Sequence, residues 1–89
     1  MGGEPLCQEN LFLVHLIIDT VKKELPNIKI YIWTGYTYEE LLKSSDAHLQ
    51  LILKNTDVLI DGPYIEAERD ITLPLRGSRN QRVIELDKN

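Results

Sequence analysis

Hydrophobic residues recur at steps of three and four through residues 6–25, which is the spacing of one face of a helix. That face is formed by Cys7, Leu11, Val14, Ile18, Val21 and Leu25. A polar stripe on the opposite side is formed by Gln8, His15, Asp19 and Lys22. The apolar side is widened by Phe12, Leu13, Leu16 and Ile17. We therefore expect a helix that begins near Pro5, is largely covered by the rest of the fold, and ends before Pro26.

Three shorter segments have the patterns of strands. Residues 28–33 alternate, with isoleucines at every second position, as in a strand with two different faces. Residues 57–61 form a continuous apolar run, which favours a parallel strand covered on both faces. Residues 82–86 predict a last strand before a polar tail.

Helical segments separate the first two strands. Thr37 and Glu40 have the spacing of a capping box, and Asp46 is a second N-cap candidate for a helix that runs to residues 55–56. Residues 65–70 predict one or two helical turns, and residues 71–81 have the composition of a loop. Strands that alternate with helices predict an α/β fold with a parallel sheet and right-handed crossovers, in a single domain over the whole chain.

Ligands bind such sheets at the edge where the carboxyl ends of the strands gather. We expect Glu4, Thr34–Tyr36 and Asp61–Tyr64 to meet at this edge, because the first precedes a helix and the others follow strands. Gly2 and Gly3 add backbone groups that no side chain covers.

Some residues near this edge can be explained by a structural role in place of ligand binding. Asp61 is as well explained by capping of the turn at Gly62–Pro63 as by ligand binding. Tyr31 and Trp33 are interpreted as packing residues rather than ligand contacts.

Arginines cluster late in the chain, where Arg76, Arg79 and Arg82 fall within seven residues that contain no acid, with Asn80 among them. Guanidinium groups bind carboxylates and phosphates through paired, planar donors. Two interpretations stay open, a solvated loop and a contact for an anion or a partner protein.

Composition narrows the function classes. The chain has 89 residues, 43% of them hydrophobic, and a net charge of −4, which fits one globular domain and argues against a nucleic-acid-binding protein. No apolar run reaches the roughly 18 residues of a membrane span. The single cysteine excludes an internal disulfide and fits a cytoplasmic protein. Cys7 is interpreted as a small hydrophobic residue and His15 as a solvated one, and no catalytic triad, phosphate loop or metal-ligand spacing occurs.

Four segments taken together resemble the activating proteins of anaerobic ribonucleoside-triphosphate reductase, which are radical S-adenosylmethionine (SAM) enzymes. The segments are Gly2–Pro5, Trp33–Tyr36, Asp57–Tyr64 and Arg76–Arg82. The first marks radical SAM enzymes broadly, whereas the last two, in this order and spacing, are much more specific. The resemblance covers nearly the whole chain and corresponds to the C-terminal part of the family's domain.

The resemblance implies the second half of a truncated α/β barrel. In the family a [4Fe-4S] cluster cleaves SAM to a radical that takes a hydrogen from a glycine of the partner reductase. By the match, Gly2, Gly3 and Glu4 bind the methionine end of SAM, with Thr34 and Asp61 at the same edge. The arginine segment is placed close to this edge.

One departure from the family is decisive. The family holds its cluster on a Cys-x3-Cys-x2-Cys loop, whereas this chain has only Cys7, so it has no ligand set for a cluster. Met1 stands where the family continues back into a strand, which implies a cloned piece, a misplaced start or a disrupted gene. Two functions stay open: part of an activating enzyme that is not competent alone and binds SAM weakly, or a non-catalytic module that contacts a reductase or a small anion. A strand edge at residues 28–33 that lacks its neighbour would also favour self-association.

Overall fold

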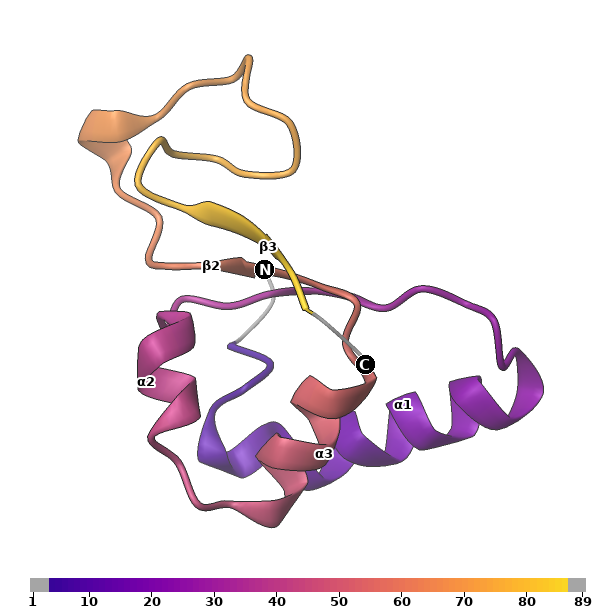
Figure 1. Ribbon diagram of the computed structural model, residues 1–89. Coiled ribbons are helices and arrows are strands. Elements are labelled where there is room, and N and C mark those ends of the chain that lie inside the picture. The colour runs from indigo at the N-terminus through magenta and orange to yellow at the C-terminus, as the bar shows by residue number, and fades with distance from the viewer. Residues whose placement is uncertain (1–3, 87–89) are drawn as a thin grey trace.

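The computed structural model describes residues 4–86 and has a sheet with all of the described α-helices on one side (Figure 1). The strand order is β1-β2-β3, with bounds Tyr31–Trp33, Val58–Asp61 and Arg82–Glu85. The α-helices are α1 Leu11–Glu24, α2 Tyr38–Leu42 and α3 Ala47–Asn55, and the 3-10 helices are η1 Gln8–Asn10 and η2 Glu66–Glu68. The α/β class expected from the sequence is confirmed.

The direction of the last strand differs from the expectation. β1 and β2 are parallel, but β3 is antiparallel to β2, so the prediction of an entirely parallel sheet was wrong. A parallel neighbour needs a crossover that returns the chain to the opposite end of the sheet. Residues 62–81 contain only the short η2, and Arg82 pairs with Asp61, so β3 begins at the end where β2 stopped.

The central strand β2 is buried along its whole length, as its continuous apolar run predicted. Leu59 faces the helices together with Ile32, its partner in β1, within a core that includes residues from all three α-helices. Ile60 faces the other way and is also fully buried, although its neighbours Trp33 and Val83 are 49% and 40% exposed. The sheet is therefore well covered over β2 and half open on both sides of it.

The first helix begins later and is less covered than its pattern predicted. A turn and η1 occupy residues 5–10, and α1 then ends before Leu25 and Pro26 as expected. Leu11 and Ile18 are buried, but four apolar residues are 50–64% exposed: Phe12, Leu13, Leu16 and Ile17. The expectation of a largely covered helix was wrong, because α3 and the sheet cover only one side of α1 within residues 4–86.

The two helix caps read from the sequence are confirmed. The Thr37 hydroxyl accepts from the Glu40 N–H at 3.2 Å, and a Glu40 oxygen accepts from the Thr37 N–H at 2.8 Å. The Asp46 carboxylate accepts from the N–H groups of His48 and Leu49 at 2.8 and 3.2 Å. Such caps satisfy N–H groups that have no partner inside the helix, so α2 and α3 begin where these side chains stand.

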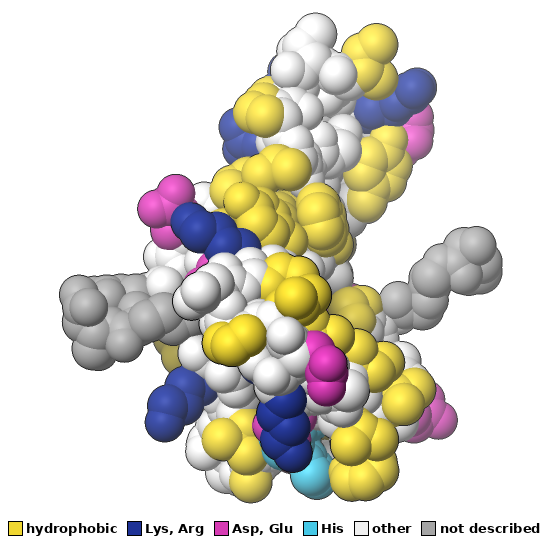
Figure 2. Space-filling view, turned by 90° about the vertical axis from the view of Figure 1, so that its right-hand side faces the viewer, with side chains coloured by type: hydrophobic (Ala, Val, Ile, Leu, Met, Phe, Trp, Pro, Cys, Tyr) yellow, Lys and Arg dark blue, Asp and Glu magenta, His cyan; other side chains and the backbone are white. Residues whose placement is uncertain are grey.

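Residues 62–81 project from the sheet as a separate lobe, seen at the top of Figures 1 and 2. The lobe is joined to the sheet by Trp33, whose indole N–H donates to the Leu75 carbonyl at 2.6 Å. Gly62 begins the lobe with φ 98°, a left-handed conformation that glycine adopts without a steric cost. None of the helices within residues 4–86 has the length and apolar character needed to cross a membrane.

Candidate functional site at the strand ends

Glu4 joins the segment before α1 to the end of β1. One carboxylate oxygen, Oε2, accepts from the Thr34 hydroxyl at 2.7 Å and from the Leu6 N–H at 2.9 Å. The other, Oε1, accepts from the Gly35 N–H at 2.6 Å. A Cβ at position 35 would lie 3.2 Å from this oxygen, so glycine lets the carboxylate approach the backbone.

An open cavity of about 290 Å³ lies beside the Glu4 carboxylate. It is lined by Glu4, Pro5, Trp33, Thr34, Gly35, Gly62, Tyr64 and Gln81. The three segments predicted to gather at the strand ends therefore do meet. A carboxylate with aromatic rings nearby is a chemistry that suits a cationic ligand.

The Glu4 carboxylate keeps some capacity for such a ligand. An ionised carboxylate has about four acceptor positions, and the three donors above leave one of them on Oε1. Glu4 is half-buried and lines the cavity, so its side chain is accessible to a ligand there.

Two lining residues of this cavity were given no ligand contact in the sequence analysis. Trp33 was interpreted as a packing residue, and Gln81 comes from the arginine segment, 77 positions after Glu4. The Gln81 amide donates to the Gly62 carbonyl at 2.9 Å and accepts from the N–H groups of Gly77 and Ser78 at 2.9 and 3.2 Å. The local sequence around Gln81 does not predict these hydrogen bonds, because the partners are backbone groups of two separate turns.

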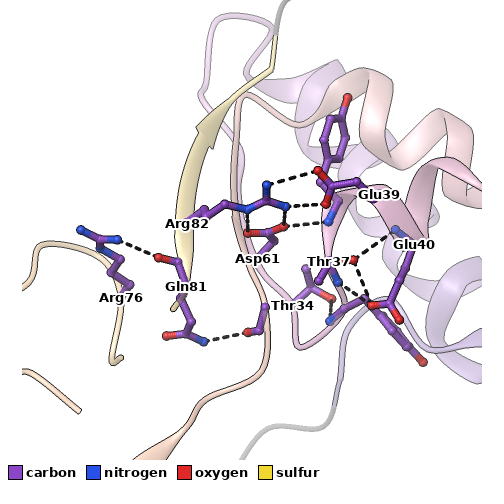
Figure 3. A network of polar contacts seen from close by, with 11 residues as sticks. Thr34, Thr37, Glu39, Glu40, Asp61, Arg76, Gln81 and Arg82 are labelled. Atoms are coloured by element: carbon purple, nitrogen blue, oxygen red, sulfur yellow. Dashed lines mark hydrogen bonds and ion pairs between the residues drawn. The ribbon is translucent and has the colours of Figure 1, made fainter. Parts of the chain in front are cut away.

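Asp61 was predicted at the same edge, but its side chain lies behind it, 1% exposed (Figure 3). Its Oδ1 accepts from Arg82 Nε at 3.0 Å, and its Oδ2 accepts from the Tyr38 N–H at 2.7 Å and from Arg82 Nη2. The structural alternative for Asp61 was a cap on the Gly62–Pro63 turn. The Asp61 carboxylate instead accepts a hydrogen bond from the backbone N–H of Tyr38, the first residue of α2.

Arg82 bridges Asp61 to Glu39, whose two oxygens lie 2.7 and 3.2 Å from its Nη atoms (Figure 3). The hydrogen bonds that Arg82 donates to Asp61, and next those that it donates to Glu39, raise the pKa of Arg82 further above its usual value. The hydrogen bond from Arg82 lowers the pKa of Glu39 in turn. Arg82 was expected to act with the arginines of the loop, but the structure pairs its guanidinium with the buried Asp61 and the exposed Glu39.

The other residues of the arginine segment have different surroundings. Arg76 Nη1 donates to the Gln81 carbonyl at 2.7 Å, and its Nε is buried with no partner among the described residues. Asn80 donates to the Pro63 carbonyl at 2.7 Å, so its side chain shapes the lobe. Arg79 is exposed. The segment contains no acid, but the fold brings Asp70 near it, since the charges of Arg79 and Arg76 contribute, after the Thr72 hydrogen bonds, to lowering the pKa of Asp70.

The described residues do not fit an iron–sulfur cluster. Clusters are held by several thiolates, and the chain has one cysteine, the half-buried Cys7. Residues 4–86 also contain no group of three His, Cys, Asp or Glu side chains placed to hold a metal ion. Gly2 and Gly3, predicted to contact a ligand, lie outside the described residues.

The chain is similar in sequence to several proteins that share one name. An activating protein of anaerobic ribonucleoside-triphosphate reductase from Vibrio cholerae is 42% identical over 80 residues, which are 90% of this chain and 49% of the relative. Proteins of the same name from Escherichia coli K12 and bacteriophage T4 are 34% and 35% identical over 82 residues, which are 92% of this chain and 51% and 48% of the relatives.

These relatives confirm the resemblance drawn from the four segments. The chain spans about half the length of the curated relatives it matches. No solved structure matches it significantly. Residues 1–84 match the family model described as a 4Fe-4S single cluster domain, and the chain belongs to this family.

Proposed function

We propose that the chain is a part of an activating protein of anaerobic ribonucleoside-triphosphate reductase, namely the part that holds the methionine end of SAM. The observation that carries this proposal is the Glu4 carboxylate, fixed by Thr34 and Gly35 at the edge of an open cavity. SAM supplies, when bound, the group that takes a hydrogen atom in this family. The activity of the whole protein is not assigned to this chain alone, because its residues do not fit a cluster.

The chain's own residues would bind and orient the cation. The free position on Glu4 Oε1 would accept one N–H of the ligand's ammonium group, and Thr34 would hold the carboxylate in place. Trp33 and Tyr64, which also line the cavity, would offer ring faces or edges to the positive charge. Gly2 and Gly3 are proposed to give backbone contacts to the same ligand. Asp61 would act from behind, by keeping the ends of β2 and β3 and the start of α2 together.

The partner contact is proposed for the lobe of residues 62–81. Arg79 is its exposed arginine within the predicted segment, and Arg76, Asn80 and Arg82 support the surfaces beside it. By the same resemblance, we propose that the chain is a single partial domain from the second half of a radical SAM barrel. It would act in the cytoplasm, with the reductase as its partner.

A second candidate function is a binding module without catalysis. Its support is that both carboxylates at the strand ends already accept three hydrogen bonds each, while Arg79 stands exposed on a projecting lobe. In this case the lobe would bind an acidic surface of a reductase, or a small anion, and SAM would not bind.

Titration with SAM separates the two functions. We expect the Gly35 amide, which donates to Glu4, to shift in NMR spectra with a dissociation constant in the millimolar range, on the order of −4 kcal/mol. S-adenosylhomocysteine, which keeps the ammonium group and lacks the sulfonium charge, is the matched ligand. Binding that is unchanged in Glu4→Gln would contradict the assignment of Glu4.

Cluster reconstitution tests whether the chain can hold an iron–sulfur cluster by itself. With one cysteine, the chain should take up no stoichiometric iron and sulfide under anaerobic conditions. Absorbance and iron analysis measure this, with Cys7→Ser as the control for non-specific iron. A stoichiometric cluster on a folded monomer would contradict the statement that the chain's residues do not fit a cluster.

A further inference from the structure

A second open cavity, of about 420 Å³, lies where the lobe meets β3. It is lined by Pro74, Leu75, Arg76, Arg82 and Val83. Val83 is the partner of Ile60, so the cavity borders the sheet face that points away from the helices. None of its lining residues is among those described beside Glu4, which makes it a separate cavity. Apolar walls with a few polar groups are typical of cavities that bind small molecules.

Arg76 has unused hydrogen-bonding capacity at this cavity. Its Nη1 donates to the Gln81 carbonyl at 2.7 Å, whereas its Nε is buried without a partner, and its Nη2 also has none among residues 4–86. A buried N–H group without a partner destabilises a fold, and an unpaired group of this kind calls for an explanation such as a bound ion. Nε and Nη2 form one edge of the guanidinium, whose two N–H groups match the two oxygens of a carboxylate.

The charge of Arg76 is not neutralised within the described part of the chain. Arg82 lines the same cavity, but each of its three guanidinium nitrogens donates to a carboxylate (Figure 3). Arg76 forms no ion pair with any acid of residues 4–86. The pKa of Asp70 is lowered chiefly by hydrogen bonds from Thr72, and the charge of Arg76 is the smallest of the causes. Asp70 is therefore not the partner that Arg76 lacks.

The backbone just before Arg76 is strained. Leu75 has φ 65°, in the left-handed region that residues other than glycine rarely adopt. Its carbonyl accepts from the Trp33 indole at 2.6 Å, a contact that holds this conformation. Strained residues persist where surrounding contacts fix them, and they cluster at ligand sites. Here the strained residue and the unpaired guanidinium line the same cavity.

We propose that this cavity binds a small organic monocarboxylate, held by the Nε–Nη2 edge of Arg76 while its apolar body lies against the apolar walls. Nε is covered in the present conformation, but the guanidinium has one hydrogen bond among the described residues, to Gln81, and can turn about it to present this edge. One guanidinium without a counter-charge matches a single negative charge. The inference rests on the anion-binding role proposed for the lobe, and it does not depend on SAM binding at the other cavity.

The first test needs no variant. The arginine Nε–H signals of the 89-residue chain are followed by NMR during titration with isocaproate. We expect the Arg76 signal to shift and saturate with a dissociation constant in the millimolar range. Isocaproamide, which has the same shape without the charge, should cause no shift. Acetate, which lacks the apolar body, should bind at least about tenfold more weakly. The absence of a saturable shift, or equal binding of the acid and its amide, would overturn the proposal.

A second titration identifies the source of the carboxylate. The same chemistry is offered by a free acid and by an acidic side chain of a protein. A blocked peptide with one leucine and one aspartate is therefore compared with isocaproate. Tighter binding of isocaproate would support a small molecule, whereas tighter binding of the peptide would overturn that assignment.

Two arginine-to-lysine substitutions locate the site. Arg76→Lys keeps the positive charge but removes the paired donors, and it should weaken isocaproate binding about tenfold, as expected for one lost hydrogen bond to a charged group. Arg79→Lys is the matched control, because Arg79 is exposed in the same segment and is not among the lining residues. Equal weakening in both variants would indicate a diffuse attraction to the lobe and would overturn the proposal. If Arg76→Lys does not fold, the comparison of acid and amide on the wild type decides. The reductase is absent from these titrations, so their failure would leave the partner contact of Arg79 to its own test.

Discussion

Glu4 and Asp61 are two carboxylates from the strand ends with opposite surroundings. Each accepts three hydrogen bonds. The donors to Glu4 are neutral, and its oxygens border an open cavity. Asp61 is 1% exposed and has the guanidinium of Arg82 as its partner, with Glu39 on the outer side of that group.

The difference separates binding from support. A buried charge must be paired and hydrogen-bonded to be tolerated, and a carboxylate used in this way has little capacity for a ligand. A half-buried carboxylate held by neutral donors keeps its negative charge available to a cation. Position at a strand end is thus a poor guide to ligand binding until the neighbours of each side chain are known.

Removing the Asp61 carboxylate should have the largest effect on stability. Asp61→Ala leaves the Tyr38 N–H and the inner side of Arg82 without an acceptor. We expect a loss of about 3 kcal/mol, the lower end for breaking a buried ion pair, because Arg82 keeps water and Glu39. Urea unfolding measures it, and Glu39→Ala, which removes the exposed partner, is the matched control. Equal losses in the two variants would contradict the division between buried and exposed partners.

Changes at Glu4 should divide between stability and binding. Glu4→Gln keeps the size of the side chain but lacks the charge, and its amide group cannot accept from all three donors. We expect about 1–1.5 kcal/mol less stability and a larger loss of SAM binding. Thr34→Val, which removes one donor to Glu4 while the charge stays, is the control. Loss of stability with unchanged binding would make Glu4 a supporting residue like Asp61.

Arg79 offers the contrasting case of an exposed charge. Its replacement by alanine should change stability by less than about 0.5 kcal/mol, since surface substitutions away from packed features are small. Binding to the reductase should weaken, while the same substitution at Arg69, also exposed on the lobe but outside the predicted segment, should leave it unchanged. A strong drop in the melting temperature with intact binding would show that the lobe is structural.

The smallest expected effect on stability is that of Glu39, the exposed partner of Arg82, and it should be seen in acid. The hydrogen bond from Arg82 lowers the pKa of Glu39 below its ordinary value of 4.5. A lowered folded-state pKa means that this stabilisation is present above pH 4.5 and is lost as the pH falls through the lowered value. In Glu39→Gln the urea midpoint should therefore decline less steeply below pH 4.5 than in the wild type. Parallel declines would show that the surface half of the cluster contributes nothing.

Much of the fold could be read from the chain because its causes are local. The capping box of Thr37 and Glu40 and the cap at Asp46 form within three residues. The buried strand around Leu59 follows from an uninterrupted apolar run. The meeting of Glu4 with Thr34 and Gly35 was also predicted, since segments at the carboxyl ends of strands share one edge whatever the details of packing.

The tertiary structure alone decided the contacts between distant segments. Arg82 stands 21 positions from Asp61 and 43 from Glu39, and His15 stands 33 from His48. The direction of β3 belongs with them, because the path of the long connection before it sets that direction. Local spacing reports which face of an element a residue occupies, whereas the partner on that face depends on how the elements pack.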